Sequence, residues 1–261
     1  MRTYIHNFIL YITVGILFVF ICTVIPAHAR SDKDTDAGYI FYKGNTLYEQ
    51  GSYNDAIKEY SKLLEQDVES GHLYYNIANA YFKKGKLGKA ILHYERAKRL
   101  IPRDSDIKLN YKFALSQIQA DTAKISTPWK EKIFGSLRFL TLNELTVLAS
   151  CLFVLIVLLL VVRLYIRMSR NTYSLLLTSL IVMIVFTVTS VCIRVSEIDK
   201  EAVTVSDSPE VKFEPFESAT THFTLHEGMR IYVIQSKQDW MKIKRSDGKT
   251  GWVRKIAAEI I

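Results

Sequence analysis

Cysteine is scarce in this chain of 261 residues, and none of its three copies lies in a polar stretch. Cys22, Cys151 and Cys192 all fall inside long apolar runs. A disulfide framework or a thiolate metal site needs cysteines in the water-exposed parts of a protein, so the sequence excludes both arrangements there. Redox chemistry at cysteine is not expected.

Motifs of catalysis are also missing. The chain has no glycine-rich loop for a phosphate, no G-x-S-x-G and no H-E-x-x-H. His222 and His226 have the spacing of two helical metal ligands, but they lie in a segment predicted to form loops and strands, where this spacing brings no convergence. His72 and His93 fall on different predicted helices and are expected at the surface. We therefore predict no enzyme activity, no cofactor and no metal.

Basic residues exceed acidic residues by 34 to 26, which gives a formal net charge of +8. Nucleic-acid binding would require a basic recognition helix or a nucleic-acid fold signature, and the sequence has neither. The basic residues flank apolar runs or are spread over predicted helix surfaces. The group Lys83, Lys84, Lys86 and Lys89 is interpreted as a solvated face. No nucleic-acid partner is predicted.

A repeat of 34 residues organises the first part of the chain, because residues 37–70 align without gaps with residues 71–104. Matched pairs include small and aromatic residues: Gly44/Ala78, Asn45/Asn79, Tyr48/Phe82, Gly51/Gly85, Ala56/Ala90 and Tyr60/Tyr94. This period is the signature of the tetratricopeptide repeat (TPR), a hairpin of two antiparallel helices. Gly51 and Gly85 are predicted to end the first helix of each pair in the left-handed conformation. A capping helix, residues 106–119, begins after Asp104 or Ser105 and completes a unit at 37–119.

In a TPR stack the first helix of each pair lines a concave groove. Positions that match the family's groove are Phe41, Asn45, Tyr48, Tyr75, Asn76, Asn79, Phe82, Asn110 and Phe113. Asparagine can both donate to and accept from an extended peptide backbone, and the aromatic residues supply apolar contact. Phe41 and Asp106 occupy two places where the family's carboxylate clamp has cations, so a C-terminal carboxylate is not the expected ligand. The alternative is that some of these residues only pack the repeats or cover helix surfaces.

Residues 1–29 resemble a secretory signal peptide, with Arg2, a long apolar run and the sequence Ala27-His28-Ala29. The apolar run exceeds the usual length, so an uncleaved N-terminal anchor is the alternative. Residues 30–36 are expected to be a charged leader. Either interpretation predicts that the TPR unit is exported.

Two further apolar runs, 142–162 and 173–193, are each long enough to cross a bilayer as a helix. The first follows a capping box, Thr141–Glu144, and a segment at 128–140 with the pattern of a basic amphipathic helix on a membrane surface. That segment could instead pack on the TPR cap. The loop 163–172 contains only basic charges, which predicts that it is cytoplasmic. Both soluble parts then lie on the extracytoplasmic side of the bacterial cytoplasmic membrane.

After Lys200 the pattern changes to short alternating stretches, which predict a small all-β domain at 201–261. The expected strands are 202–205, 229–234, 240–244 and 251–253. Three motifs resemble the bacterial SH3-like (SH3b) domains in sequence and order: L-H-E-G from Leu225, W-M-K-I from Trp240 and D-G-K-T-G-W-V from Asp247. The resemblance implies a small barrel, with Trp240 or Trp252 in its core.

The predicted fold class is therefore multidomain: α-helical TPR hairpins, two transmembrane helices and a small all-β SH3-like barrel. As a whole the chain resembles the BatE-type proteins of the aerotolerance (Bat) operons, most specifically in Tyr74–Phe82 and in Ala90–Ala97. That resemblance implies a membrane-anchored scaffold that works with von Willebrand A-domain membrane proteins and a MoxR-type ATPase. The alternatives are a cell-wall sensor that binds peptidoglycan through the SH3-like domain, and an accessory subunit of an enzyme.

Overall fold

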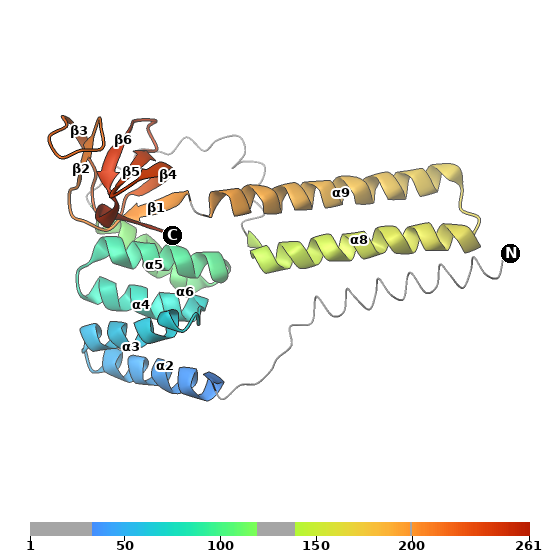
Figure 1. Cartoon of the computed structure of the whole chain (residues 1–261). Coiled ribbons are helices and arrows are strands. Elements are labelled where there is room, and N and C mark those ends of the chain that lie inside the picture. Colours follow the sequence, from blue (N-terminus) through green and yellow to red (C-terminus); the bar gives the residue numbers. More distant parts are fainter. Residues whose placement is uncertain (1–32, 119–138, 199) are drawn as a thin grey trace. The chain divides into compact units, whose positions relative to one another are not determined.

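The computed structural model describes residues 33–118, 139–198 and 200–261 (Figure 1). The chain divides into two compact units. Leu142–Val195 belongs to one unit, and the other combines Ser31–Thr141 with Ser196–Ile261. The predicted signal peptide at 1–29 and most of the predicted surface helix at 128–140 lie outside the described residues.

Five helices form the first part of the larger unit: α2 (Lys33–Glu49), α3 (Tyr53–Glu65), α4 (Gly71–Lys83), α5 (Leu87–Leu100) and α6 (Ser105–Ser116). Helices α2 and α3 pack as one hairpin and α4 and α5 as the next, with α6 against α5. This arrangement confirms the predicted helical repeats. Helix α2 begins at Lys33, four residues before the predicted start of the repeat at residue 37, so the helix includes part of the predicted charged leader.

The helix ends follow from single residues. Gly51 and Gly85 adopt φ values of 77° and 72°, which confirms the predicted left-handed turns between the helices of each hairpin. The carboxylate of Asp104 accepts hydrogen bonds from the backbone N–H groups of Asp106 and Ile107, each at 2.9 Å. This cap starts α6 where the sequence predicted a helix.

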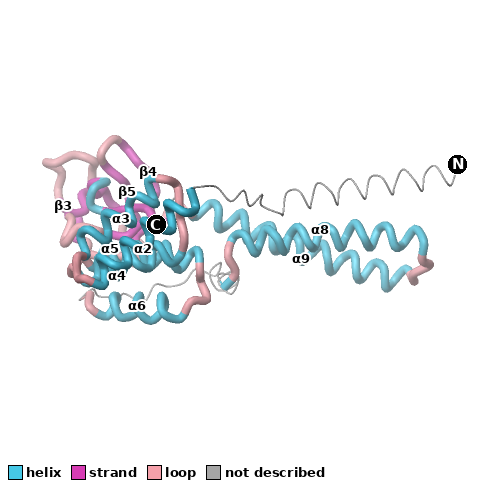
Figure 2. The backbone as a smooth tube through the Cα atoms, turned by 90° about the horizontal axis from the view of Figure 1, so that it is seen from below, coloured by secondary structure: helices cyan, strands magenta, loops and turns pink. Residues whose placement is uncertain are grey.

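The smaller unit contains two long helices, α8 (Leu142–Tyr165) and α9 (Arg170–Glu197), which lie side by side and antiparallel (Figures 1 and 2). Both are long and apolar enough to cross a membrane. Each is longer than its predicted span, so the connection shortens to residues 166–169. Across this connection the guanidinium of Arg163 lies 3.9 Å from the ring centroid of Tyr173.

The C-terminal part is one antiparallel sheet of seven strands in the order β3-β2-β6-β5-β4-β1-β7. The strands are β1 (Glu201–Thr204), β2 (Glu210–Lys212), β3 (Thr221–Thr224), β4 (Arg230–Lys237), β5 (Trp240–Lys244), β6 (Thr250–Arg254) and β7 (Ala258–Ile260). Four of them, β1, β4, β5 and β6, correspond to the predicted strands. Within residues 200–261 the pairings leave β3 and β7 as edges, so the sheet is not closed as the predicted barrel would be. Trp240 and Trp252 are both buried, as predicted for at least one of them.

One apolar cluster joins the last TPR helices to the sheet. Val203 from β1 and Ile261 after β7 are buried together with Ala78, Ala90 and Tyr94. A second cluster, which includes Ile231, Ile243 and Val253, fills the sheet itself, and a third fills the first TPR hairpin. The helices and the sheet of the larger unit therefore share a core.

A pair of glycine substitutions tests the helix geometry. Gly85→Ala is expected to lower the free energy of unfolding by about 1 kcal/mol, because alanine is strained at this positive φ. Gly38→Ala, inside α2 with no atom near its added Cβ, is expected to raise it by about 0.5–1 kcal/mol. Thermal unfolding of the full chain in detergent, followed by far-ultraviolet circular dichroism, measures both shifts. Shifts of the same sign would contradict this account of the turn.

Candidate protein-binding groove

Two equivalent sets of side chains, each an Asn–Tyr–Asn triad, connect three consecutive elements of the TPR stack. In the first triad, the Tyr60 hydroxyl of α3 donates to Asn45 Oδ1 of α2 at 2.6 Å, and Asn76 Nδ2 of α4 donates to the same oxygen at 2.8 Å. The first asparagine oxygen is thus the acceptor for both partners.

The second triad repeats the pattern one TPR later. The Tyr94 hydroxyl of α5 donates to Asn79 Oδ1 of α4 at 2.5 Å, and Asn110 Nδ2 of α6 donates to that oxygen at 3.3 Å. Asn110 Nδ2 also donates to the hydroxyl of Tyr75 at 2.8 Å. Each member is 34 residues beyond its counterpart, so the sequence repeat reproduces a hydrogen-bonded unit as well as a pair of helices.

Both tyrosines of the triads are buried, each with about 1% of its surface exposed. Burial raises the pKa of Tyr60 to about 12 and raises the pKa of Tyr94 as well. Both hydroxyls therefore stay protonated and act as donors at neutral pH. A Cβ on Gly44 would lie 2.4 Å from Cε1 of Tyr60, so the absence of a side chain at this position allows the ring to approach α2.

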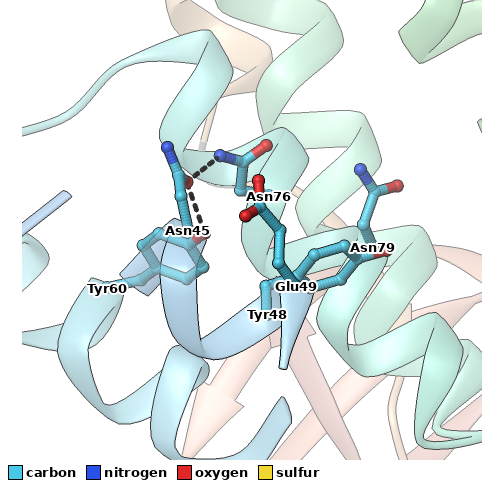
Figure 3. A pocket seen from close by; sticks show the side chains of 6 residues that line it. All are labelled: Asn45, Tyr48, Glu49, Tyr60, Asn76 and Asn79. Carbon is cyan, nitrogen blue, oxygen red and sulfur yellow. Dashed lines mark hydrogen bonds between the residues drawn. The ribbon is translucent and has the colours of Figure 1, made fainter. Parts of the chain in front are cut away.

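The first triad lines a cavity of about 200 Å³ (Figure 3). Its walls are formed by six residues from α2, α3 and α4: Asn45, Tyr48, Glu49, Tyr60, Asn76 and Asn79. Figure 3 shows the hydrogen bonds that join Asn45 to Asn76 and to Tyr60, with Asn79 on the neighbouring turn of α4. The cavity wall therefore combines amides with aromatic rings.

The hydrogen bonds within the triads use either the oxygen or the nitrogen of each asparagine amide, but not both. Among residues 33–118 and 200–261, no hydrogen bond involves Nδ2 of Asn45 or Asn79, or Oδ1 of Asn76 or Asn110. All four side chains are partly exposed. Two amide donors and two amide acceptors are thus available to a ligand.

The predicted groove residues divide into four groups in the structure. Four of them line the cavity: Asn45, Tyr48, Asn76 and Asn79. Tyr75 and Asn110 are bonded to each other, and Phe82 and Phe113 contact each other with ring centroids 5.5 Å apart. Phe41 packs toward the core of the first hairpin, 5.9 Å from the ring of Tyr60.

Sequence reasoning missed two residues of the cavity wall. Tyr60 was matched with Tyr94 in the repeat, but neither was assigned to the groove because both fall on the second helix of their hairpin. Glu49 is an exposed residue at the end of α2, and none of the matched pairs of the repeat includes it.

One histidine prediction was wrong. His93 is buried between the rings of Tyr74 and Tyr81, with ring centroids 5.8 and 5.4 Å away, whereas His72 is exposed as predicted. Burial lowers the pKa of His93 to about 3, so its ring is neutral and packs as an aromatic group. Among the described residues, no group of three His, Cys, Asp or Glu side chains could hold a metal ion.

Comparison with known protein families agrees with this architecture. Residues 44–85 match the family described as TPR repeat, and residues 73–104 match the tetratricopeptide repeat. Residues 44–104 are TPR repeats. No curated protein matches the chain. TPR repeats indicate a role in protein–protein interaction.

The tyrosine of the second triad can be tested directly. Tyr94→Phe removes a buried donor and leaves Asn79 Oδ1 with only the longer bond from Asn110, so we expect the free energy of unfolding to fall by about 1–2 kcal/mol. Tyr42→Phe, at a tyrosine that is 68% exposed, should change it by less than about 0.5 kcal/mol. Thermal unfolding of the full chain measures both. Equal effects of the two substitutions would mean that the triad does not stabilise the repeat.

Proposed function

We propose that this protein is a non-catalytic, membrane-anchored scaffold whose TPR groove binds an extended segment of a partner protein. The repeated triad carries this proposal, because each of its asparagines keeps one donor or acceptor that internal hydrogen bonds do not use. The main chain of an extended segment presents N–H and C=O groups that need such partners. The free Nδ2 of Asn45 suits a carbonyl, and the free Oδ1 of Asn76 suits an N–H group.

Apolar contact would come from the aromatic residues around the amides. Tyr48 lies in the cavity wall, and Phe113, which is 55% exposed, lies against Phe82 at the last helix of the stack. Exposed aromatic side chains of this kind anchor protein partners because they bury much apolar surface at a small cost in conformational entropy. Among the described residues, Glu49 is the one charged side chain that lines the cavity, which favours recognition of main-chain and apolar groups over a charged terminus.

Helices α8 and α9 would anchor the scaffold in a bilayer as a two-span hairpin. The TPR helices and the sheet flank this hairpin in sequence and share an apolar cluster, which requires both of them to be on one side of the membrane. Arg163, Arg167 and Arg170 lie at the connection of the hairpin, so the positive-inside rule favours a cytoplasmic connection and an extracytoplasmic TPR unit.

We further propose that residues 201–261 are an SH3-like domain and that the protein belongs to a Bat-type envelope complex. The D-G-K-T-G-W-V motif supports the first point, because Asp247 accepts from the backbone N–H of Lys249 in the β5–β6 turn and Trp252 is buried. The order of segments along the chain supports the second. Von Willebrand A-domain membrane proteins and a MoxR-type ATPase are the partner classes that follow from that resemblance.

Site-specific photo-crosslinking tests the groove. A photoreactive amino acid that replaces Tyr48 in the cavity wall is expected to crosslink one protein partner in intact membranes, whereas the same amino acid at exposed Tyr39 should not. Asn45→Ala/Asn79→Ala should reduce the crosslinked product at least about tenfold, because two main-chain hydrogen bonds are lost. Mass spectrometry identifies and quantifies the product.

A second double variant separates binding from stability. Asn45→Asp/Asn79→Asp keeps the oxygen that accepts from Tyr60 and Tyr94 but replaces the outward amide donors. It should lose the crosslink while the TPR helices stay folded. An unchanged product in both double variants would refute the groove assignment.

Thiol labelling tests the topology. In a variant without native cysteines, a membrane-impermeant maleimide added to intact bacteria should label Glu65→Cys in the TPR unit and Lys249→Cys in the sheet. Ser169→Cys, in the connection between α8 and α9, should react only after the cells are permeabilised. Labelling of Glu65→Cys and Lys249→Cys from opposite sides of the membrane would contradict the hairpin.

A further inference from the structure

A buried carboxylate stands at the contact between the TPR helices and the sheet. Glu95 of α5 is only 4% exposed. Its Oε2 lies 2.9 Å from Lys98 Nζ, and its Oε1 lies 3.5 Å from Nη1 of Arg230 and accepts a hydrogen bond from the Tyr111 hydroxyl of α6. Cations and donors from α5, α6 and β4 thus converge on one side chain.

Arg230 connects this carboxylate to a second one. Its Nη2 donates to Glu201 Oε2 on β1 at 3.1 Å, while Nη1 faces Glu95. Arg99 of α5 donates to the same Glu201 oxygen at 3.2 Å. Five charged groups from α5, β1 and β4 therefore form one network, with Arg230 as the group that bridges the two carboxylates.

Helix α5 also covers the edge strand of the sheet. Arg96 Nη2 donates to the main-chain oxygen of Ile260, and Arg99 Nη1 donates to that of Ile261, each at 2.6 Å. Main-chain carbonyls at a sheet edge would otherwise need water or another strand. The contact therefore uses backbone groups of the sheet as well as its side chains.

Close packing surrounds the charges. Val203 and Ile261 lie in the apolar cluster of the last TPR helices. A Cβ on Gly228, which has φ 78°, would lie 2.2 Å from Ile118 Cδ1 and 2.8 Å from Ile91 Cδ1. A side chain at this position would therefore require the side chains of Ile118 and Ile91 to shift.

Residues that are adjacent in the sequence take part in the second triad and in the contact between the helices and the sheet. Tyr94 donates to Asn79 in the triad, and the next residue, Glu95, binds Arg230. Asn110 belongs to the triad, and the next residue, Tyr111, binds Glu95. Any shift of α5 or α6 at the sheet would therefore move the tyrosine and the last asparagine of the second triad.

We propose that Arg230 is a positioning residue of the binding groove: by bridging Glu95 and Glu201 it ties the sheet to α5 and α6 and holds the second triad in its binding geometry. This inference rests on the proposed function of the groove. The first triad lies on α2, α3 and α4 and shares no residue with the bridge. The sheet thereby acts on half of the groove without contacting the ligand.

The charge states support this role. Burial by itself lowers the pKa of Arg230, but the carboxylates of Glu95 and Glu201 raise it above its usual value. Burial raises the pKa of Glu95, and Arg230 and Lys98 outweigh this effect and hold it below its usual value. Arg230 and Glu95 are therefore both charged at neutral pH. Removal of Arg230 would leave the buried carboxylate of Glu95 with one cation fewer. This change destabilises the contact between the helices and the sheet more than the loss of an ion pair at the surface would.

Amide hydrogen exchange of the full chain in lipid nanodiscs tests the proposal. In Arg230→Met, exchange in α5 and α6 should become at least about tenfold faster, while exchange in α2 and α3 stays unchanged. Arg230→Lys keeps a cation and should restore most of the protection. Arg245→Met is the matched control, because Arg245 pairs with Asp247 in the turn between β5 and β6, so its loss should leave α5 and α6 unaffected.

The photo-crosslink supplies the second readout, with the photoreactive amino acid at Phe113 on α6. Arg230→Met should reduce the crosslinked product, and Arg230→Lys should recover it. Unchanged exchange in α6 would overturn the proposal, as would exchange that rises equally in all TPR helices. Faster exchange in α5 and α6 with an unchanged amount of crosslinked product would also overturn it. If the groove does not bind a partner at all, the asparagine variants described above show this separately.

Discussion

The hydrogen bond from a buried tyrosine to an asparagine oxygen is the interaction on which the TPR unit depends. It satisfies a hydroxyl that would be costly to bury alone, and it fixes which side of each amide is occupied. Because the tyrosine and the asparagine belong to the two helices of one hairpin, the same bond sets their relative position. The third member, an asparagine of the next hairpin or of α6, then joins successive repeats.

Sequence periodicity predicted the helices well because the repeat places small residues and turn glycines where two helices cross or a helix ends. It could not predict the triads, since an alignment of residues does not say which atoms meet. The short strands β2, β3 and β7 were missed for another reason. Each has only three or four residues, too few to show an alternating pattern, and β7 forms its ladder with β1, which lies more than 50 residues earlier.

The contact between α5 and the sheet was not predictable from the sequence. The backbone N–H of Gly88 donates to Glu227, 139 residues later, and helices α8 and α9 lie between these two residues in the sequence. Charged residues are rarely buried unless they are paired. From the sequence alone, a solvated helix face or an exposed strand would therefore be expected at Glu95, Arg99 and Arg230. His93 was misassigned for the same reason, since its burial depends on two tyrosines of α4.

The triad pattern stops at α6. The position 34 residues beyond Asn79 is occupied by Phe113, which is exposed and contacts Phe82. A segment that followed the whole groove would meet amides over the two repeats and an exposed aromatic side chain at the capping helix α6. The two ends of such a surface differ in chemistry. It would accept many sequences along most of its length but would select a bulky apolar side chain at one end, which fixes both the orientation and the register of the segment.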